Sequence, residues 1–178
     1  MNVIKILIVD DHMIFREGIK KVLASASDIE VAGEAGNGKD ALQAITEKNY
    51  DVVLQDLALP DIEGLDLLRR IRNQKPALPV LVLSFFPEEQ FAVRVLKEGA
   101  SGYLTKESVP NELINAIRKA AGGGKYISAA LAENLAGSIT GEKERLPHEL
   151  LSSREFQIFS MIAAGKSVKE MSNDLSLS

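Results

Sequence analysis

Polar residues that could carry chemistry stand at the ends of four apolar runs in this sequence. They are Asp10 and Asp11, Asp56, Ser84 and Lys106. Carboxylate oxygens are the ligands that Mg²⁺ takes in proteins, and aspartate is a known covalent nucleophile toward phosphate. A carboxylate beside Mg²⁺ and a lysine is suited to phosphoryl transfer, because the two cations stabilise the phosphoryl oxygens during the attack.

Charge balance supports this interpretation. Three carboxylates within about 4 Å of one another would repel by roughly 4 kcal/mol per pair at an effective dielectric constant near 20. Lys106 can offset one of these charges, and a divalent cation can offset the rest. Each residue alone has a simpler explanation, since an Asp-Asp pair after a strand is usually a helix cap and a single Ser or Lys is usually an ordinary surface residue. The combination of all five indicates a site.

The segment from Tyr50 to Gly64 must position Asp56. Its apolar, β-branched run is short, and the chain turns at Pro60 and Gly64, which is typical of a buried strand. Asp56 should therefore lie at the carboxyl end of a strand. Open parallel sheets have their ligand sites at that edge.

Strand and helix patterns alternate five times over the first 121 residues. This alternation predicts parallel βαβ units with right-handed crossovers, and so a doubly wound α/β domain at 1–121. In such a sheet the four polar strand ends converge on one crevice. The apolar runs predict strands at 3–9, 30–34, 50–56, 78–83 and 101–105, each followed by an amphipathic helix.

The chain changes character after residue 121. Residues 122–150 contain a glycine triplet, an Ala/Leu-rich segment at 128–135 and a mixed-charge stretch, which predicts a linker with one short helix. Two capping boxes follow and predict the two short helices that begin a helix-turn-helix unit at 151–178. The boxes are Ser152 with Glu155 and Ser167 with Glu170; the apolar residues of the helices are Phe156, Phe159 and Ile162, then Val168, Met171 and Leu175.

The composition is that of a soluble globular protein, with 46% hydrophobic and 26% charged residues in a chain of 178. A net charge of −4 gives no overall basic surface for nucleic acid. The absence of cysteine excludes disulfides and thiolate metal sites, and it fits a reducing compartment. The sequence shows neither a signal peptide nor a membrane span, so we expect a cytoplasmic protein without a membrane partner.

Residues 1–121 resemble the receiver domain of two-component response regulators. Residues 150–178 resemble the opening of the LuxR-type helix-turn-helix domain of the NarL/FixJ class. The resemblance implies a flavodoxin-like parallel sheet of strand order 2-1-3-4-5, followed by part of a DNA-binding domain. It rests on Asp10-Asp11, the segment 56–60 with Gly64, Ser84, and Tyr103 with Lys106, then on Leu151-Ser152-Ser153-Arg154-Glu155 and Gly165-Lys166-Ser167.

The resemblance also implies a role for each matched residue. Asp56 would accept a phosphoryl group from a sensor histidine kinase, and Lys106 would contact the phosphoryl oxygens. The Ser84 hydroxyl would follow the new phosphate, and Tyr103 would change rotamer. The Mg²⁺ ligands would be Asp11, Asp56 and the backbone carbonyl of Ala58, with Asp10 acting mainly through water. The chain would not be an enzyme in the usual sense, although it would take part in its own phosphorylation and dephosphorylation.

Two positions depart from the receiver pattern. Phe85 follows Ser84 where the family usually has a small residue. Its ring would either narrow access for the phosphoryl donor and for water, or point away and only alter rates. Gln55 is polar within an apolar strand, and alternation sends it to the face opposite Asp56, so we expect it to have a packing or hydrogen-bonding role.

The C-terminal segment also departs from its family, because the recognition helix, which carries the base-reading residues, would begin after Ser178. From Pro147 onward, Lys and Arg number three against four acidic residues, which is a poor phosphate-binding surface. We therefore expect DNA binding if the full module is present, together with dimerisation on phosphorylation.

Three alternatives stay open at this point. The first is a receiver that shuttles phosphate or switches protein interactions without binding DNA. The second is an aspartyl-phosphate phosphatase, although the haloacid-dehalogenase type needs an Asp-x-Asp motif after its first strand and this chain has Asp10-Asp11. The third is a pseudo-receiver that never takes phosphate.

Overall fold

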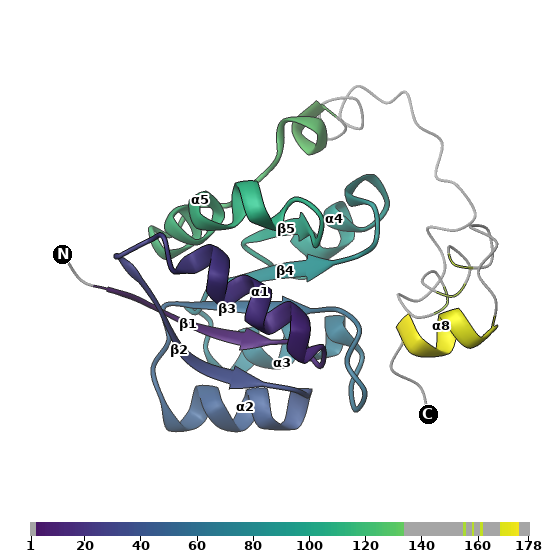
Figure 1. Cartoon of the computed structure of the whole chain (residues 1–178), viewed down its shortest axis with the longest axis horizontal. Coiled ribbons are helices and arrows are strands. Elements are labelled where there is room, and N and C mark those ends of the chain that lie inside the picture. Colours follow the sequence, from purple (N-terminus) through teal and green to yellow (C-terminus); the bar gives the residue numbers. More distant parts are fainter. Residues whose placement is uncertain (1–2, 134–154, 156–157, 159–160, 162–167, 175–178) are drawn as a thin grey trace.

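The computed structural model describes residues 3–133, 155, 158, 161 and 168–174 (Figure 1). Its centre is a five-stranded parallel sheet of order β2-β1-β3-β4-β5, so the predicted doubly wound fold and strand order are confirmed. The strands are β1 (Ile4–Val9), β2 (Ile29–Ala35), β3 (Val52–Asp56), β4 (Val80–Ser84) and β5 (Gly102–Thr105). The helices are α1 (Met13–Leu23), α2 (Gly38–Glu47), α3 (Gly64–Gln74), α4 (Glu88–Lys97), α5 (Val109–Ala121) and α8 (Val168–Asp174).

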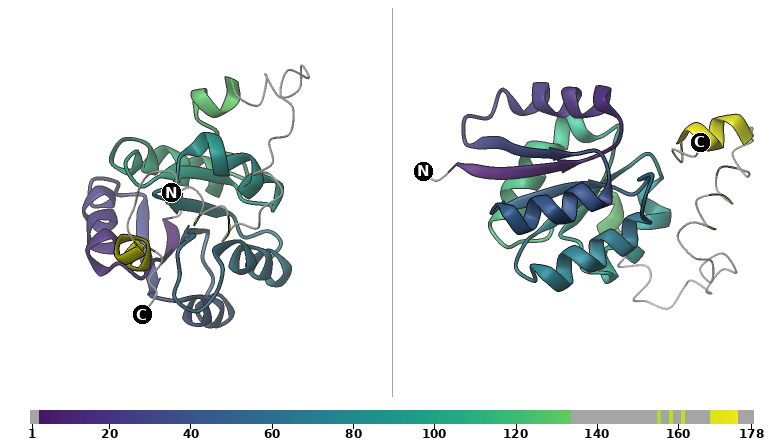
Figure 2. Two further views of the ribbon diagram at one scale, coloured as in Figure 1. Left: turned by 90° about the vertical axis from the view of Figure 1, so that its right-hand side faces the viewer. Right: turned by 90° about the horizontal axis from the view of Figure 1, so that it is seen from below.

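Helices cover both faces of the sheet, with α1 and α5 on one face and α2, α3 and α4 on the other (Figure 2). Along β1, Leu7 and Val9 belong to the core under α2–α4, whereas Ile6 and Ile8 belong to the core under α1 and α5. All four side chains are fully buried. Burial on both faces explains why these strands read as continuous apolar runs rather than as alternating ones.

Hydrogen bonds and close packing fix the loop between β3 and α3 at both ends. Gln55 is fully buried, and its Nε2 donates to the Gly64 carbonyl at 2.6 Å, which confirms the expected hydrogen-bonding role of this residue. A side chain at Gly64 would place its Cβ 2.5 Å from Leu57 Cα. Asp61 receives the backbone N–H groups of Gly38 and Lys39 at 2.8 and 2.9 Å, which caps the first turn of α2. The loop that begins at Asp56 is therefore held rigidly.

The segment after α5 packs back against the sheet edge. The Tyr126 N–H donates to the Ser101 carbonyl at 2.7 Å, and Tyr126 forms an isolated parallel bridge with Gly102 of β5. Residues 129–133 are helical and Leu131 is buried, so the described part of the linker includes the short helix that was predicted. This part of the linker is an ordered extension of the core.

The C-terminal part of the chain is described only in pieces. Helical residues occur at 155, 158 and 161, and α8 coincides with the second helix predicted there. Val168, expected as an apolar residue of that helix, is 78% exposed. Phe156, Phe159, Ile162 and Leu175 lie outside the described residues. In the part of the chain that the structure describes, none of the helices has the length and apolarity needed to cross a bilayer.

We predict that Gly64→Ala destabilises the fold by about 1–3 kcal/mol, because the new methyl group would overlap backbone atoms of Leu57 that have no room to shift. Urea unfolding monitored by circular dichroism measures this change. Gly36→Ala is the matched control, since nothing lies within 4 Å of a Cβ built at Gly36. Equal stability of the two variants would contradict the tight approach of α3 to the loop.

Candidate functional site

The carboxyl ends of three strands place charged side chains in one pocket of the sheet edge. Asp10 and Asp11 directly follow β1, Asp56 is the last residue of β3, and Lys106 directly follows β5. Asp10, Asp56 and Lys106 are buried, and Asp11 is partly exposed at the rim. Parallel pairing of β1 with β3, β3 with β4 and β4 with β5 brings these residues together although as many as 96 positions separate them in sequence.

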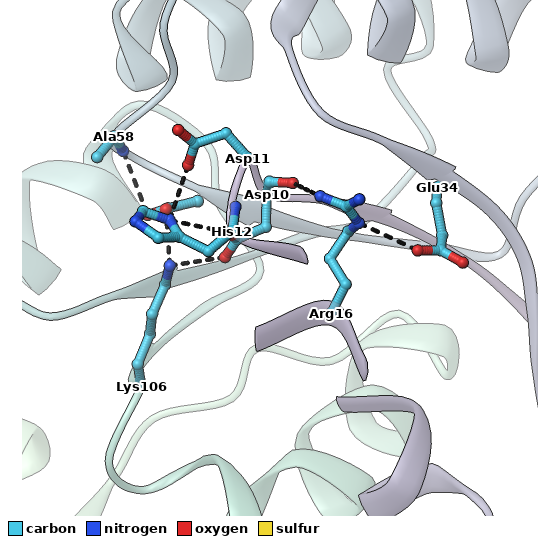
Figure 3. A network of polar contacts seen from close by, with 8 residues as sticks. Asp10, Asp11, His12, Arg16, Glu34, Ala58 and Lys106 are labelled. Atoms are coloured by element: carbon cyan, nitrogen blue, oxygen red, sulfur yellow. Dashed lines mark hydrogen bonds and ion pairs between the residues drawn. The ribbon is translucent and has the colours of Figure 1, made fainter. Parts of the chain in front are cut away.

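Lys106 is the centre of the site (Figure 3). Its Nζ lies 2.6 Å from Asp10 Oδ2 and 2.7 Å from Asp56 Oδ2, and its side chain has no exposed surface. The other oxygen of Asp56 accepts the Ala58 N–H at 3.2 Å. The Lys106 ammonium forms short, charge-assisted hydrogen bonds with two carboxylates. Its single positive charge balances only one of their two negative charges.

Asp10 is fixed from its other side by the start of α1. Its Oδ1 accepts the His12 N–H at 2.8 Å, and its backbone carbonyl accepts from Arg16 Nη1 at 2.6 Å. Arg16 in turn pairs with Glu34 at the end of β2, at 3.1 Å (Figure 3). His12 Nδ1 lies 2.8 Å from Asp11 Oδ1. The acidic pair lies just before α1, whose N-cap residue is His12, and no side chain caps this helix. The helix-cap explanation for Asp10-Asp11 is therefore wrong, and both residues belong to the site.

The pKa of the Asp56 carboxyl is raised to about 6. Burial is the main cause, and the nearby Asp10 charge raises the pKa further, while Lys106 and the Ala58 N–H act in the opposite direction. The surroundings of Asp56 therefore disfavour its charged form. A cation bound beside Asp56 would stabilise the carboxylate and lower its pKa.

The acidic group fits a hard divalent cation. Asp10, Asp11, His12 and Asp56 each offer one ligand atom, and these atoms all lie within 4.8 Å of one another. Carboxylate oxygens dominate the set, which suits Mg²⁺ with several of its waters retained. Ala58, whose carbonyl the resemblance adds to the ligands, is buried two residues after Asp56. Receiver domains generally bind Mg²⁺ at such an acidic pocket.

Ser84 and Tyr103 lie behind the site on neighbouring strands. Ser84 is fully buried, and its Oγ accepts the Phe86 N–H at 3.2 Å. The Tyr103 ring is buried, and its hydroxyl donates to the Phe86 carbonyl at 2.8 Å. Burial raises the pKa of the Tyr103 hydroxyl above its ordinary value, so it remains a donor. Both predicted switch residues therefore bind the backbone of Phe86, Ser84 at its N–H and Tyr103 at its carbonyl. The Phe86 ring packs on Phe91 of α4 with ring centroids 4.8 Å apart.

Phe85 points toward the site. Its ring centroid lies 4.7 Å from Lys106 Nζ, and the Phe15 ring of α1 lies 4.5 Å from the same atom. Of the two alternatives for Phe85, the one in which the ring points away is therefore wrong. In this direction the Phe85 ring contacts the Lys106 ammonium and the Phe15 ring, and both contacts are favourable.

Sequence reasoning missed three residues of the site. Phe15 contacts the Lys106 ammonium, Arg16 binds the Asp10 carbonyl, and His12 lies among the candidate metal ligands. The one signal available was proximity in sequence, since all three lie within six residues of Asp10. The other histidine, His148, lies outside the described residues.

A parallel sheet of this order with an acidic pair, a buried aspartate and a buried lysine at its carboxyl edge defines a receiver domain. Comparison with family models agrees, because residues 6–118 match the response regulator receiver domain and residues 149–178 match the bacterial regulatory proteins of the luxR family. The first range lies within the expected domain at 1–121, and the second includes the expected domain at 151–178.

Curated relatives span both regions. The response regulator UvrY of Escherichia coli K12 is 39% identical over 98% of this chain and 81% of its own length. GacA of Pseudomonas aeruginosa is also 39% identical, over 98% of this chain and 82% of its own. A LuxR-family response regulator from Aurantimonas sp. SI85-9A1 superposes with a TM-score of 0.72 at 32% identity, covering 78% of this chain and 99% of that one. The chain belongs to the two-component response regulators with a receiver domain and a LuxR-type domain.

We predict that Asp56→Asn stabilises the metal-free protein at pH 7.5 by as much as about 3 kcal/mol, the equivalent of a pKa of about 6 in the folded and 3.8 in the unfolded chain. The raised pKa means that the folded state binds the Asp56 proton more tightly than the unfolded chain does. Protonation of Asp56 therefore contributes fully to the free energy of unfolding below pH 4, and this contribution is lost as the pH rises through 6. Urea unfolding between pH 4 and 8 in the presence of a chelator measures the difference.

Asp66→Asn serves as the control for this titration, because Asp66 is an exposed carboxylate paired with Arg69. Its substitution should change stability little across the same pH range. A wild-type protein whose stability follows that of Asp56→Asn at every pH would contradict the unbalanced burial of Asp56.

Proposed function

We propose that the chain is a phosphorylation-controlled regulator in which Asp56 accepts a phosphoryl group from a sensor histidine kinase. The observation that carries this proposal is the position of Lys106 Nζ, which lies within 2.7 Å of both the Asp56 and the Asp10 carboxylates in a buried pocket. A structural ion pair would need one carboxylate. The surplus of negative charge supports a site built to receive a cation and a group that Lys106 can hold.

The residues of the site divide the work. Asp56 Oδ attacks the phosphorus, and the donor departs with the bonding electron pair. Lys106 already touches Asp56, so its ammonium is in place to contact the phosphoryl oxygens as they arrive. Asp10, Asp11, Asp56 and the Ala58 carbonyl would hold Mg²⁺, which supplies positive charge against the phosphoryl oxygens when bound. The chain is thus a phosphoacceptor that assists its own phosphorylation and dephosphorylation, and not a separate enzyme.

The switch begins at Ser84 and Tyr103. If Ser84 Oγ turns to the new phosphoryl group, the Phe86 N–H loses its acceptor, and Tyr103 can leave the Phe86 carbonyl. Both events release the turn that leads into α4. A local change of charge then biases an element with two arrangements, which is the general form of phosphorylation switches.

The output reaches the linker through the first turn of α4. Glu88 Oε2 accepts from Ser128 Oγ at 2.5 Å, and Ser128 Oγ accepts the Leu131 N–H at 3.0 Å, so one serine caps the linker helix and joins it to α4. Leu131 belongs to the same buried core cluster as Phe91 and Tyr103. Movement of Phe86 and Glu88 would loosen this docked segment and so change the placement of the domain that follows.

DNA binding by the LuxR-type domain, dimerisation on phosphorylation and a cytoplasmic location complete the proposal. The match of residues 149–178 to the luxR family supports the first of these. The sensor kinase is the partner that the receiver class implies. A receiver that only shuttles phosphate would need no docked linker, and the contacts of Ser128 and Leu131 therefore favour a regulated output domain.

We predict that incubation with Mg²⁺ and acetyl phosphate adds one phosphoryl group to the protein, because the carboxylate, the lysine and the candidate metal ligands are already assembled. Intact mass spectrometry measures the gain. Asp56→Asn should abolish it, and Asp66→Asn should leave it intact. A folded wild-type protein that gains no phosphoryl group, with or without Mg²⁺, would leave a receiver fold that does not take phosphate.

We further predict that phosphorylation accelerates hydrogen exchange of the backbone amides of Tyr126 and Leu131, whose acceptors are Ser101 and Ser128. Ser128→Ala should accelerate exchange of the Leu131 amide without phosphorylation, because it removes the cap. Ser25→Ala is the control, since Ser25 makes its hydrogen bond to Val22 at the end of α1. Unchanged protection of both amides in the phosphorylated protein would rule out release of the linker.

A further inference from the structure

We propose that Phe15 and Phe85 form an aromatic cover that holds Lys106 against its two carboxylates and limits the access of water and of the phosphoryl donor to Asp56. The effect on phosphorylation rests on the function proposed above, whereas the hold on Lys106 does not. The two residues come from different elements, Phe15 from the first turn of α1 and Phe85 from the turn between β4 and α4.

The geometry around the ammonium is that of a cage. Two of the three N–H groups of Lys106 are used by Asp10 and Asp56, at 2.6 and 2.7 Å. The rings of Phe15 and Phe85 lie 4.5 and 4.7 Å from the same nitrogen, and their centroids are 6.3 Å apart at an interplanar angle of 55°. Both distances are within the range of cation–π attraction, so the aromatic faces complete the surroundings of a charge that has no exposed surface.

The two rings are not held equally. Phe15 belongs to a helix whose first turn is fixed by backbone hydrogen bonds from Phe15 and Arg16 to His12. Phe85, in contrast, is 63% exposed, although it is large and apolar. The Phe85 ring is therefore held over the site mainly by its contacts with Lys106 and Phe15. Rotation of the Phe85 side chain would disturb little other packing. Phe15 is the fixed half of the cover and Phe85 the movable half.

The cover explains how a buried nucleophile is kept from solvent. Asp56 is 2% exposed, so neither a donor nor a hydrolytic water reaches it without displacement of a neighbour. Phe85 combines contact with Lys106, whose ammonium lies 4.7 Å from the ring centroid, and high exposure. Its displacement would open the Lys106 side of Asp56, and its return would enclose Lys106 again. Phe85 is thus a positioning residue for Lys106 and sets the rates at which Asp56 is reached.

The first test needs no phosphorylation. Lys106 is acetylated with acetic anhydride at short times, and peptide mass spectrometry gives its rate relative to that of the exposed Lys39. Loss of a cation–π contact and of the shielding ring should raise the Lys106 rate on the order of tenfold in Phe85→Ala. Phe85→Tyr keeps the ring and should restore the wild-type rate, whereas Phe85→Leu, which keeps bulk without an aromatic face, should remain fast.

The second test measures phosphoryl gain from acetyl phosphate and phosphoryl loss after the donor is removed, by intact mass. Both rates should rise about three- to tenfold in Phe85→Ala and should again be restored by Phe85→Tyr. Ile14→Ala is the matched control, because Ile14 is an equally apolar and more exposed residue beside Phe15, at 86% exposure.

The outcomes separate the two proposals. Equal acetylation of Lys106 in wild type and Phe85→Ala, with the fold intact, overturns the cover whatever happens with phosphate. Wild-type behaviour of Phe85→Leu overturns the aromatic part of it. Faster acetylation in Phe85→Ala together with no phosphorylation of any variant upholds the hold on Lys106 and overturns instead the phosphoacceptor function and the gating of Asp56.

Discussion

A lysine ammonium buried between two carboxylates is the interaction on which the rest of this structure depends. Lys106 forms hydrogen bonds with Asp10 and Asp56 where no water reaches it, and this arrangement leaves a net negative charge in the pocket. Buried charges are tolerated only when they are paired and fixed in good geometry. Burial is the main cause of the raised pKa of Asp56, and the nearby Asp10 charge adds to it. A cation bound at the pocket would offset the remaining negative charge.

The surrounding fold supplies the fixed geometry. Three parallel strands end at one edge, and the Asp56 loop is held by Gln55 and by the close approach of Gly64 to Leu57. The N–H of His12, just before α1, holds the Asp10 carboxylate. Three further features lie around this rigid centre. They are the exposed Phe85 ring, the Phe86 backbone hydrogen-bonded to Ser84 and Tyr103, and the linker joined to α4 through Ser128. The proposed switch would act through these contacts.

Much of the fold and of the site could be predicted from the sequence. Continuous apolar runs located the five strands within a few residues, because burial on both faces of a sheet leaves a pattern in the chain. Polar residues at the ends of those runs located Asp10, Asp56 and Lys106. The role of Gln55 also followed from strand alternation. The roles of Ser84 and Tyr103 came from family resemblance and stay predictions.

The sequence by itself therefore determined the strand–helix alternation, the family and the identity of the charged residues, since each depends on local residue pattern. Only the tertiary structure decided which way Phe85 points, that Phe15 and His12 belong to the site, and that Ser128 ties the linker to Glu88. These facts depend on contacts between segments far apart in the chain. The direction of a side chain on a loop or on a helix turn depends on the partner that the fold brings near it. The local sequence pattern does not identify that partner.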